Sequence, residues 1–128
     1  MEPSGTHLLL ELQDCNSDLL DDVAYIERQM LDAAIKSGAT IVGKSFHKFE
    51  PTGVTGIVAI AESHLSIHTW PEHEYAAVDI FTCGDSFYPT RAADLIISGL
   101  KSLEPSITEI KRGIISNSPR TVVGRSNK

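Results

Sequence analysis

Residues 55–82 read TGIVAIAESHLSIHTWPEHEYAAVDIFT, and their pattern gives the clearest indication of the fold. It contains runs of apolar, β-branched and aromatic residues between short polar breaks: 55–61, 64–70 and 75–82. Runs of this length and composition predict β-strands, and connections this short join antiparallel neighbours. A similar run, 40–49, precedes the break at Pro51-Thr52-Gly53. The segment therefore predicts four strands in series, paired as an antiparallel meander.

Two amphipathic helices are predicted, one on each side of the meander. The first follows from apolar residues at spacings of three and four between Leu19 and Ala34, with Gly38 as a suitable C-cap. Its N-cap candidates are Asn16, Ser17 and Asp18. The second helix is predicted to begin at Pro89 and to end before Pro105.

Outer strands at 6–13 and 107–112 complete the predicted fold. The order strand, helix, several strands, helix and strand predicts an α+β fold. We expect a two-layer sandwich, in which helices pack on one face of a mainly antiparallel sheet. Residues 1–115 are expected to form a single domain, and 116–128 a polar C-terminal tail.

The whole chain has 128 residues, with 11 Lys and Arg against 17 Asp and Glu, which gives a net charge of −6. This size suits one domain with one core and leaves no room for a separate cofactor domain. The acidic balance argues against a nucleic-acid partner, since such proteins usually carry a basic stripe. No secretory leader or membrane-spanning run is recognised, and Cys15 and Cys83 are too few for a disulfide framework. We therefore expect a cytoplasmic protein with no membrane partner.

Reactive side chains are concentrated at 62–72 and 79–85, which contain hydroxyls, histidines, a thiol and carboxylates. Successive side chains of a strand alternate between its faces. One face is therefore predicted to carry His64, Ser66, His68 and Trp70. Cys83 ends the next run, and we expect hairpin pairing to bring it near His68.

Three interpretations are open from these residues alone. The first is a Ser or Cys nucleophile with a histidine base, which requires hydrogen-bond contact and an oxyanion stabiliser. The second is a metal site, although the spacing matches no recognised zinc motif. Its candidate ligands are His64, His68, His73 and Cys83. The third is a purely structural role for histidines on a half-exposed sheet.

A longer match distinguishes these interpretations. Residues 62–72, ESHLSIHTWPE, and 75–84, YAAVDIFTCG, resemble the signature of the short prokaryotic S-adenosylmethionine decarboxylase proenzymes, a pyruvoyl-dependent family. Shorter matching segments lie upstream: GTHL at 5–8, SGATIV at 37–42, FHKF at 46–49 and GVTG at 53–56. The resemblance extends from about residue 5 to residue 112.

The resemblance implies that the chain cuts itself between Glu62 and Ser63. The Ser63 hydroxyl attacks the preceding carbonyl and converts the amide into an ester. β-Elimination then leaves a dehydroalanine that hydrolyses to a pyruvoyl group, the covalent cofactor, and no metal is expected. His68 is implied as the base that removes the Ser63 α-proton, since an imidazole titrates near neutrality. Thr55 occupies a processing position that the family often fills with serine.

In the family, the pyruvoyl carbonyl condenses with the substrate amine and accepts the electrons released with carbon dioxide. Cys83 is implied as the acid that then protonates the substrate carbon, since a thiol with a pKa of about 8.5 is mostly protonated at neutral pH. Phe49 and His68 are implied to hold the adenine between them, and Glu72 to bind the ribose hydroxyls. The implied reaction converts S-adenosylmethionine into S-adenosylmethioninamine, the propylamine donor for spermidine biosynthesis.

Two other functions stay open. A pyruvoyl-dependent arginine or ornithine decarboxylase would keep the processing residues and differ in the pocket around Phe49 and Glu72. An unprocessed regulatory or binding paralogue is the third hypothesis, and the presence of Ser63, His68 and Cys83 argues against it. The resemblance further implies a dimer of cleaved αβ units, with the site between two protomers and Phe49 reaching across.

Overall fold

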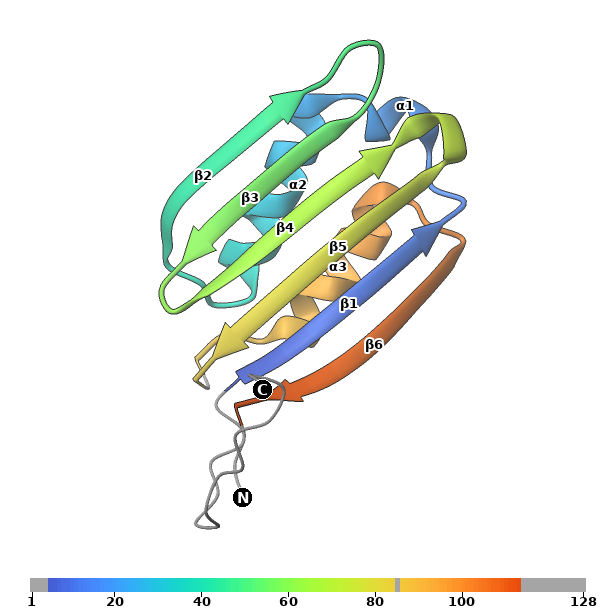
Figure 1. Ribbon diagram of the computed structural model, residues 1–128. Helices are drawn as coiled ribbons and strands as arrows, with labels where there is room; N and C mark the ends of the chain where they lie inside the picture. Colours follow the sequence, from blue (N-terminus) through green and yellow to red (C-terminus); the bar gives the residue numbers. More distant parts are fainter. Residues whose placement is uncertain (1–4, 85, 114–128) are drawn as a thin grey trace, which may run out of the picture.

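The computed structural model describes residues 5–84 and 86–113, which form two layers (Figure 1). One layer is a six-stranded sheet in the order β2-β3-β4-β5-β1-β6, and all neighbouring strands are antiparallel. The helices lie together behind this sheet in the view of Figure 1. The expected α+β sandwich is therefore confirmed. The predicted tail, 116–128, lies outside the described residues.

The bounds of the elements agree with most of the predicted runs. The strands are β1 (Gly5–Gln13), β2 (Ile41–Lys48), β3 (Val54–Ile60), β4 (Ser63–Trp70), β5 (Tyr75–Cys83) and β6 (Glu104–Arg112). The helices are α1 (Ser17–Leu20), α2 (Val23–Lys36), the 3₁₀ turn η1 (Pro71–His73) and α3 (Pro89–Leu100). Strands β2 to β5 form the predicted meander.

The last strand is longer than the predicted run 107–112, because β6 begins at Glu104 and includes Pro105. Pro105 pairs with Leu12 of β1. Since β6 is the outermost strand, the missing N–H of Pro105 interrupts no ladder on a second side.

The single helix predicted between Leu19 and Ala34 is in fact two helices. Asn16 caps α1, because its side chain accepts a hydrogen bond from the backbone N–H of Leu19 at 3.0 Å. Asp22 caps α2 in the same way, with the N–H of Tyr25 at 3.0 Å. The apolar spacing continues across the break between α1 and α2, because the buried residues of both helices face the same core. Periodicity alone therefore did not reveal the second cap.

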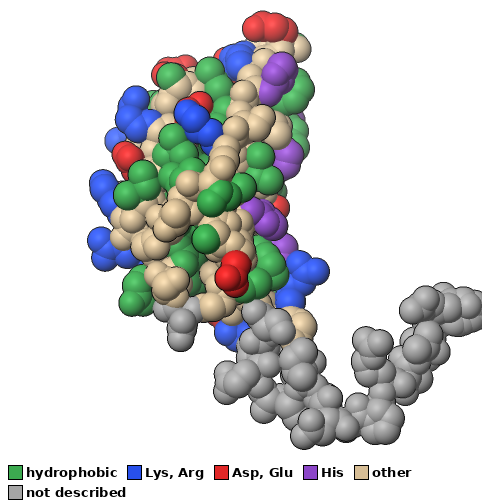
Figure 2. All heavy atoms as spheres, turned by 90° about the vertical axis from the view of Figure 1, so that its left-hand side faces the viewer, with side chains coloured by type: hydrophobic (Ala, Val, Ile, Leu, Met, Phe, Trp, Pro, Cys, Tyr) green, Lys and Arg blue, Asp and Glu red, His purple; other side chains and the backbone are tan. Residues whose placement is uncertain are grey.

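The core fills the space between the helices and one face of the sheet. Alternate residues of the strands are buried there, as in β1, where Leu8, Leu10 and Leu12 are buried. The other face of the sheet carries no helix, and we call it the open face. Figure 2 shows histidine side chains gathered at the edge of the molecule that belongs to this face. Among the described residues, no helix is long and apolar enough to cross a membrane.

Candidate active site

Ser63 is the first residue of β4 and follows a two-residue turn, Ala61-Glu62. Ile60 pairs with Ser63 across this turn. Glu62 is exposed and has a φ of 62°, in the left-handed region that costs a side-chain-bearing residue about 1 kcal/mol. The Glu62–Ser63 peptide bond therefore lies in an exposed turn with a strained residue on its amino side.

Cys83 is next to Ser63, because the end of β5 lies beside the start of the antiparallel strand β4. The backbone N–H of Cys83 donates a hydrogen bond to Ser63 Oγ, with a distance of 3.0 Å. This contact fixes the position of Ser63 Oγ. Because the oxygen is the acceptor, the hydroxyl proton of Ser63 is not used in this hydrogen bond. The Cys83 thiol is free and half-buried. We call Ser63 and Cys83 the cleavage cluster.

His68 lies on the open face, five residues further along β4. It pairs with Thr55 of β3, and Thr55 Oγ1 is 3.1 Å from His68 Nδ1. The imidazole is therefore hydrogen-bonded on one nitrogen, and the exposed side chain can use the other nitrogen for proton transfer.

A hollow of about 270 Å³ opens beside His68. It is lined by Phe49, Thr52, Gly53, Val54, Thr55, His68, Thr69, Trp70 and Glu72. Glu72 accepts a hydrogen bond from Thr52 Oγ1 at 3.1 Å, and Phe49 is in edge-to-face contact with His47. The structure thus brings Phe49, Thr55, His68 and Glu72 to one hollow, and we call these four residues the histidine cluster.

The loop between β2 and β3 carries Phe49 into this hollow and is fixed by Asp21. The carboxylate of Asp21 accepts a hydrogen bond from the backbone N–H of Gly53 at 2.8 Å. Lys48 Nζ lies 3.2 Å from the same oxygen. The Gly53 hydrogen bond, and then Lys48, hold the pKa of Asp21 below its ordinary value. Gly53 itself has a φ of 110°, which other residues rarely adopt.

Trp70 lines the hollow, and its side chain is 39% exposed, so it does not lie beneath the site. Its ring stacks on Tyr75 at a centroid distance of 5.2 Å. The Tyr75 hydroxyl donates to Glu11 Oε1 at 2.6 Å, and burial together with Glu11 raises the pKa of Tyr75 to about 12. Sequence reasoning assigned neither Tyr75 nor Glu11 to the site, and the alternation that puts both on the open face was the only signal.

The expectation that Cys83 lies near His68 is wrong. Tyr75 pairs with Trp70, so the register places Ala77 opposite His68. Cys83 is at the far end of β5, and Ser63 is separated from His68 by five residues, or about 16 Å at about 3.3 Å per residue. The sequence predicted which face each residue occupies but not this register, which follows from the short connection through η1.

Between the two clusters, a polar group surrounds Asp79 at the middle of β5. Ser66 Oγ donates a hydrogen bond to Asp79 Oδ2 at 3.2 Å. His7 Nε2 is 3.5 Å from Asp79 Oδ1, and this buried nitrogen has no hydrogen-bond partner among the described residues. Arg112 Nη1 lies 3.4 Å from the other nitrogen of His7. We call these four residues the Asp79 cluster.

The four metal-ligand candidates of the sequence do not come together. His68 and Cys83 lie toward opposite ends of the antiparallel β4–β5 pair, and His73 is in η1. Across residues 5–84 and 86–113, no group of three or more His, Cys, Asp or Glu side chains could hold a metal ion.

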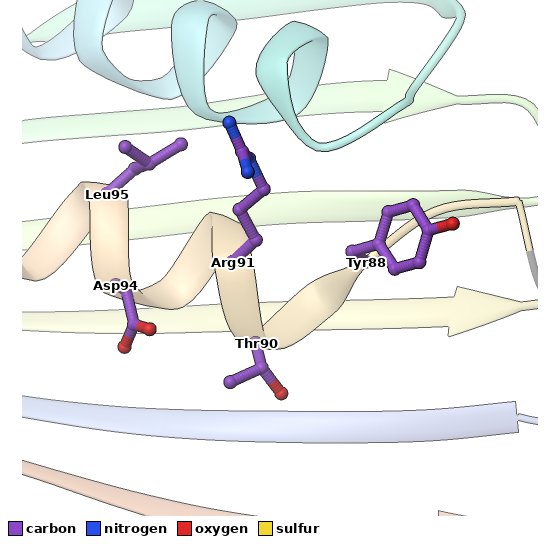
Figure 3. A pocket seen from close by; sticks show the side chains of 5 residues that line it. All are labelled: Tyr88, Thr90, Arg91, Asp94 and Leu95. Atoms are coloured by element: carbon purple, nitrogen blue, oxygen red, sulfur yellow. The ribbon is translucent and has the colours of Figure 1, made fainter.

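A hollow larger than the one beside His68 lies on the opposite side of the molecule, along α3 (Figure 3). Its volume is about 700 Å³, and Arg91 extends over it toward α2. The lining residues are Tyr88, Thr90, Arg91, Asp94 and Leu95. Neither cluster contributes a residue, so size does not identify the reactive site here.

Comparison with known proteins shows which family the chain belongs to. The model of the family described as S-adenosylmethionine decarboxylase matches residues 6–113. A protein of Thermodesulfovibrio yellowstonii named S-adenosylmethionine decarboxylase proenzyme is 53% identical over 113 residues, which are 88% of this chain and 84% of that protein. A Clostridium tetani protein of the same name is 51% identical over 114 residues, 89% of this chain and 90% of the relative.

Solved structures give the same relationship. The adenosylmethionine decarboxylase of Aquifex aeolicus has a TM-score of 0.85 and 35% identity, and the match covers 94% of this chain and all of that chain, 100%. The Trypanosoma brucei AdoMetDC-delta26 monomer has a TM-score of 0.60 at 12% identity, over 80% of this chain and 44% of that chain, which shows a likeness of fold alone. From the family match along 6–113 and relatives about half identical over most of their length, the chain belongs to the S-adenosylmethionine decarboxylase family.

Proposed function

We propose that this chain is a proenzyme that cuts itself between Glu62 and Ser63 and then decarboxylates S-adenosylmethionine to S-adenosylmethioninamine. The observation that carries this proposal is the Ser63 oxygen, held at 3.0 Å by the N–H of Cys83 directly after a strained turn. Family membership supplies the reaction class. Ser63 is the residue that would become the pyruvoyl group.

The residues present fit that group. The pyruvoyl carbonyl supplies an electron sink for the electrons left when carbon dioxide departs from the substrate. Ser63 would provide the carbon atoms of the group, and water would supply its keto oxygen when the dehydroalanine hydrolyses. Cys83, whose backbone N–H contacts Ser63 Oγ, is half-buried and carries a thiol that can serve as a proton donor. His68, hydrogen-bonded to Thr55, has an exposed ring that can remove the Ser63 α-proton during processing.

One chain cannot perform this chemistry with its own two clusters. A proton transfer needs hydrogen-bond distance, and about 16 Å separates Ser63 from His68 along β4. A second copy packed on the open face, with its β4 reversed, would bring its His68 to the end of the sheet at which β4 begins with Ser63. We therefore propose a dimer of cleaved αβ units in which each site combines one cleavage cluster with the partner's histidine cluster.

The composition of the hollow favours an adenosine-containing substrate. Phe49 and Trp70 offer aromatic surfaces for a base, and the Glu72 carboxylate can accept hydrogen bonds from ribose hydroxyls. Arginine or ornithine would need neither surface. A positively charged sulfonium substrate is also compatible with the net charge of −6.

Intact-mass measurement and carbon dioxide release together test this function. We expect two fragments, residues 1–62 and a pyruvoyl-started 63–128, and release from carboxyl-labelled S-adenosylmethionine well above that from arginine or ornithine. Ser63→Ala should remain one uncut chain because it lacks the attacking hydroxyl. A wild-type chain that stays intact after long incubation would instead support the unprocessed paralogue. Preferential release from an amino acid would overturn the substrate.

A further inference from the structure

If two copies share their sites as proposed, the open face determines where their symmetry axis lies. This inference rests on the proposed function, because it takes Ser63 of one copy to lie over His68 of the other. Two identical sheets stacked face to face are related by a two-fold axis that runs between them, parallel to both. When the dimer is viewed perpendicular to the sheets, the two-fold rotation exchanges positions on the two sides of the axis, as reflection in a line would. The axis must therefore bisect the line from Ser63 to His68 at a right angle.

The bisector crosses the sheet along one row of paired residues. Its midpoint falls beside Ser66 on β4, and Ser66 pairs with Asp79 on β5 and with Ile57 on β3. Asp79 in turn pairs with Leu9 on β1. Measured along the strands, each of these residues is displaced from the axis by no more than about 2 Å, which is half of one residue step. In the dimer each would face the same residue of the second copy.

We propose that the two Asp79 carboxylates of the dimer face each other across this axis and that dimer formation takes up a proton in the Asp79 cluster. Stacked sheets are about 10 Å apart, and side chains from both fill that space. The Asp79 side chain is 40% exposed in the single chain, so dimer formation removes it from water. Two neighbouring desolvated carboxylates repel each other unless one binds a proton or a cation lies between them.

The surroundings of Asp79 offer no permanent cation at contact distance. Its direct partners are the Ser66 hydroxyl, at 3.2 Å, and the His7 imidazole, at 3.5 Å. Arg112 is bonded to the far side of His7, and its guanidinium lies 5.2 Å from the Phe81 ring centre. The other titratable groups that face Asp79 from β1, β4 and its own strand are Glu11, His64, His68 and Tyr75. The proton would thus be held by the Asp79 pair or by His7.

The sign of the pH dependence follows from this arrangement. A cluster whose pKa is higher in the dimer than in the free chain stabilises the dimer at low pH, and that stabilisation falls as the pH rises toward the higher pKa. For one proton per dimer, the dissociation constant rises by at most about tenfold per pH unit.

Sedimentation equilibrium of the cleaved protein between pH 5 and pH 8 tests the proposal. We expect the dissociation constant to rise with pH in the wild type, and Asp79→Asn to remove the slope and to tighten the dimer at pH 8. Asp94→Asn is the matched control, since Asp94 lies on α3 behind the sheet and should leave the slope unchanged (Figure 3).

If the dimer is too tight to dissociate, the thermal midpoint replaces the dissociation constant. Asp79→Asn should then raise the midpoint more at pH 8 than at pH 5, and Asp94→Asn should not. A dimer with no pH slope, or an Asp79→Asn variant that keeps the slope, overturns this inference and leaves the proposed function intact. A chain that cleaves and decarboxylates as a monomer overturns the shared site, and this inference with it.

Discussion

At the scale of single residues, the backbone and the side chain of Cys83 have different proposed roles. The N–H of Cys83 donates a hydrogen bond to the Ser63 oxygen, whereas its thiol is the proposed proton donor to the substrate. Any residue other than proline would supply that N–H. If the proposed function is correct, self-cleavage and decarboxylation depend on different atoms of Cys83, and a substitution should separate the two reactions.

Cys83→Ala is expected to cut itself normally and to lose decarboxylation by about 100-fold or more, the usual contribution of a general acid. Fragment formation on a denaturing gel and labelled carbon dioxide release measure the two reactions separately. Cys15→Ala is the control, because Cys15 is buried away from both clusters and should change neither reaction. Unchanged turnover in Cys83→Ala would exclude the thiol as the proton donor.

At the scale of the elements, the cut would leave the two fragments interleaved in one sheet. Strand β3 belongs to the first fragment and pairs with β4 of the second. Strand β1 belongs to the first and lies between β5 and β6 of the second. Neither fragment could keep its core without the other, because fragments of this size are marginal by themselves. The proposed single domain would thus persist after cleavage.

The loop between β2 and β3 provides a prediction about substrate binding. Asp21→Asn keeps the shape of the side chain but removes its negative charge. The ion pair with Lys48 is then lost, and the hydrogen bond from the Gly53 N–H is weakened. We expect a several-fold rise in KM for S-adenosylmethionine with a smaller change in kcat, because Phe49 would be less well positioned. Asp32→Asn, on the exposed side of α2, is the matched control.

Substrate binding through the loop between β2 and β3 is expected to weaken in acid. Since the pKa of Asp21 is lowered in the folded protein, its stabilising contacts are present above the ordinary pKa of 3.8 and are lost as the pH falls through the lowered value. The wild-type KM should therefore approach that of Asp21→Asn only in strong acid. Equal KM values for the two proteins at neutral pH would contradict a positioning role for Asp21.

At the scale of the whole molecule, the separation of the two clusters leads to the proposal that two chains share each active site. Co-expression of Ser63→Ala and His68→Ala chains tests this directly. A mixed dimer contains one site with both residues intact, so about half of the His68→Ala chains should be cut in a random mixture. Each variant expressed alone should stay uncut. If the mixture also stays uncut, His68 of one chain does not act as the base for Ser63 of the other chain.

Local sequence pattern alone was sufficient to predict the fold class, the meander and the shared face of His64, Ser66 and His68. Period-two alternation is a local property of the chain, and the buried residues Leu65 and Ile67 leave only one choice for the side of His64, Ser66 and His68. The second helix cap, at Asp22, was not predicted because the apolar spacing continues without interruption from α1 into α2. The match around Ser63 indicated the chemistry.

Only the tertiary structure decided which reactive residues are neighbours. Register depends on the length and shape of each connection, and η1 places His68 opposite Ala77 rather than Cys83. That shift leaves Ser63 and Cys83 at one end of the sheet and His68 with Thr55 toward the other. Alternation gives a residue its face but not its partner across the ladder, because every even shift of one strand against the next preserves the same faces.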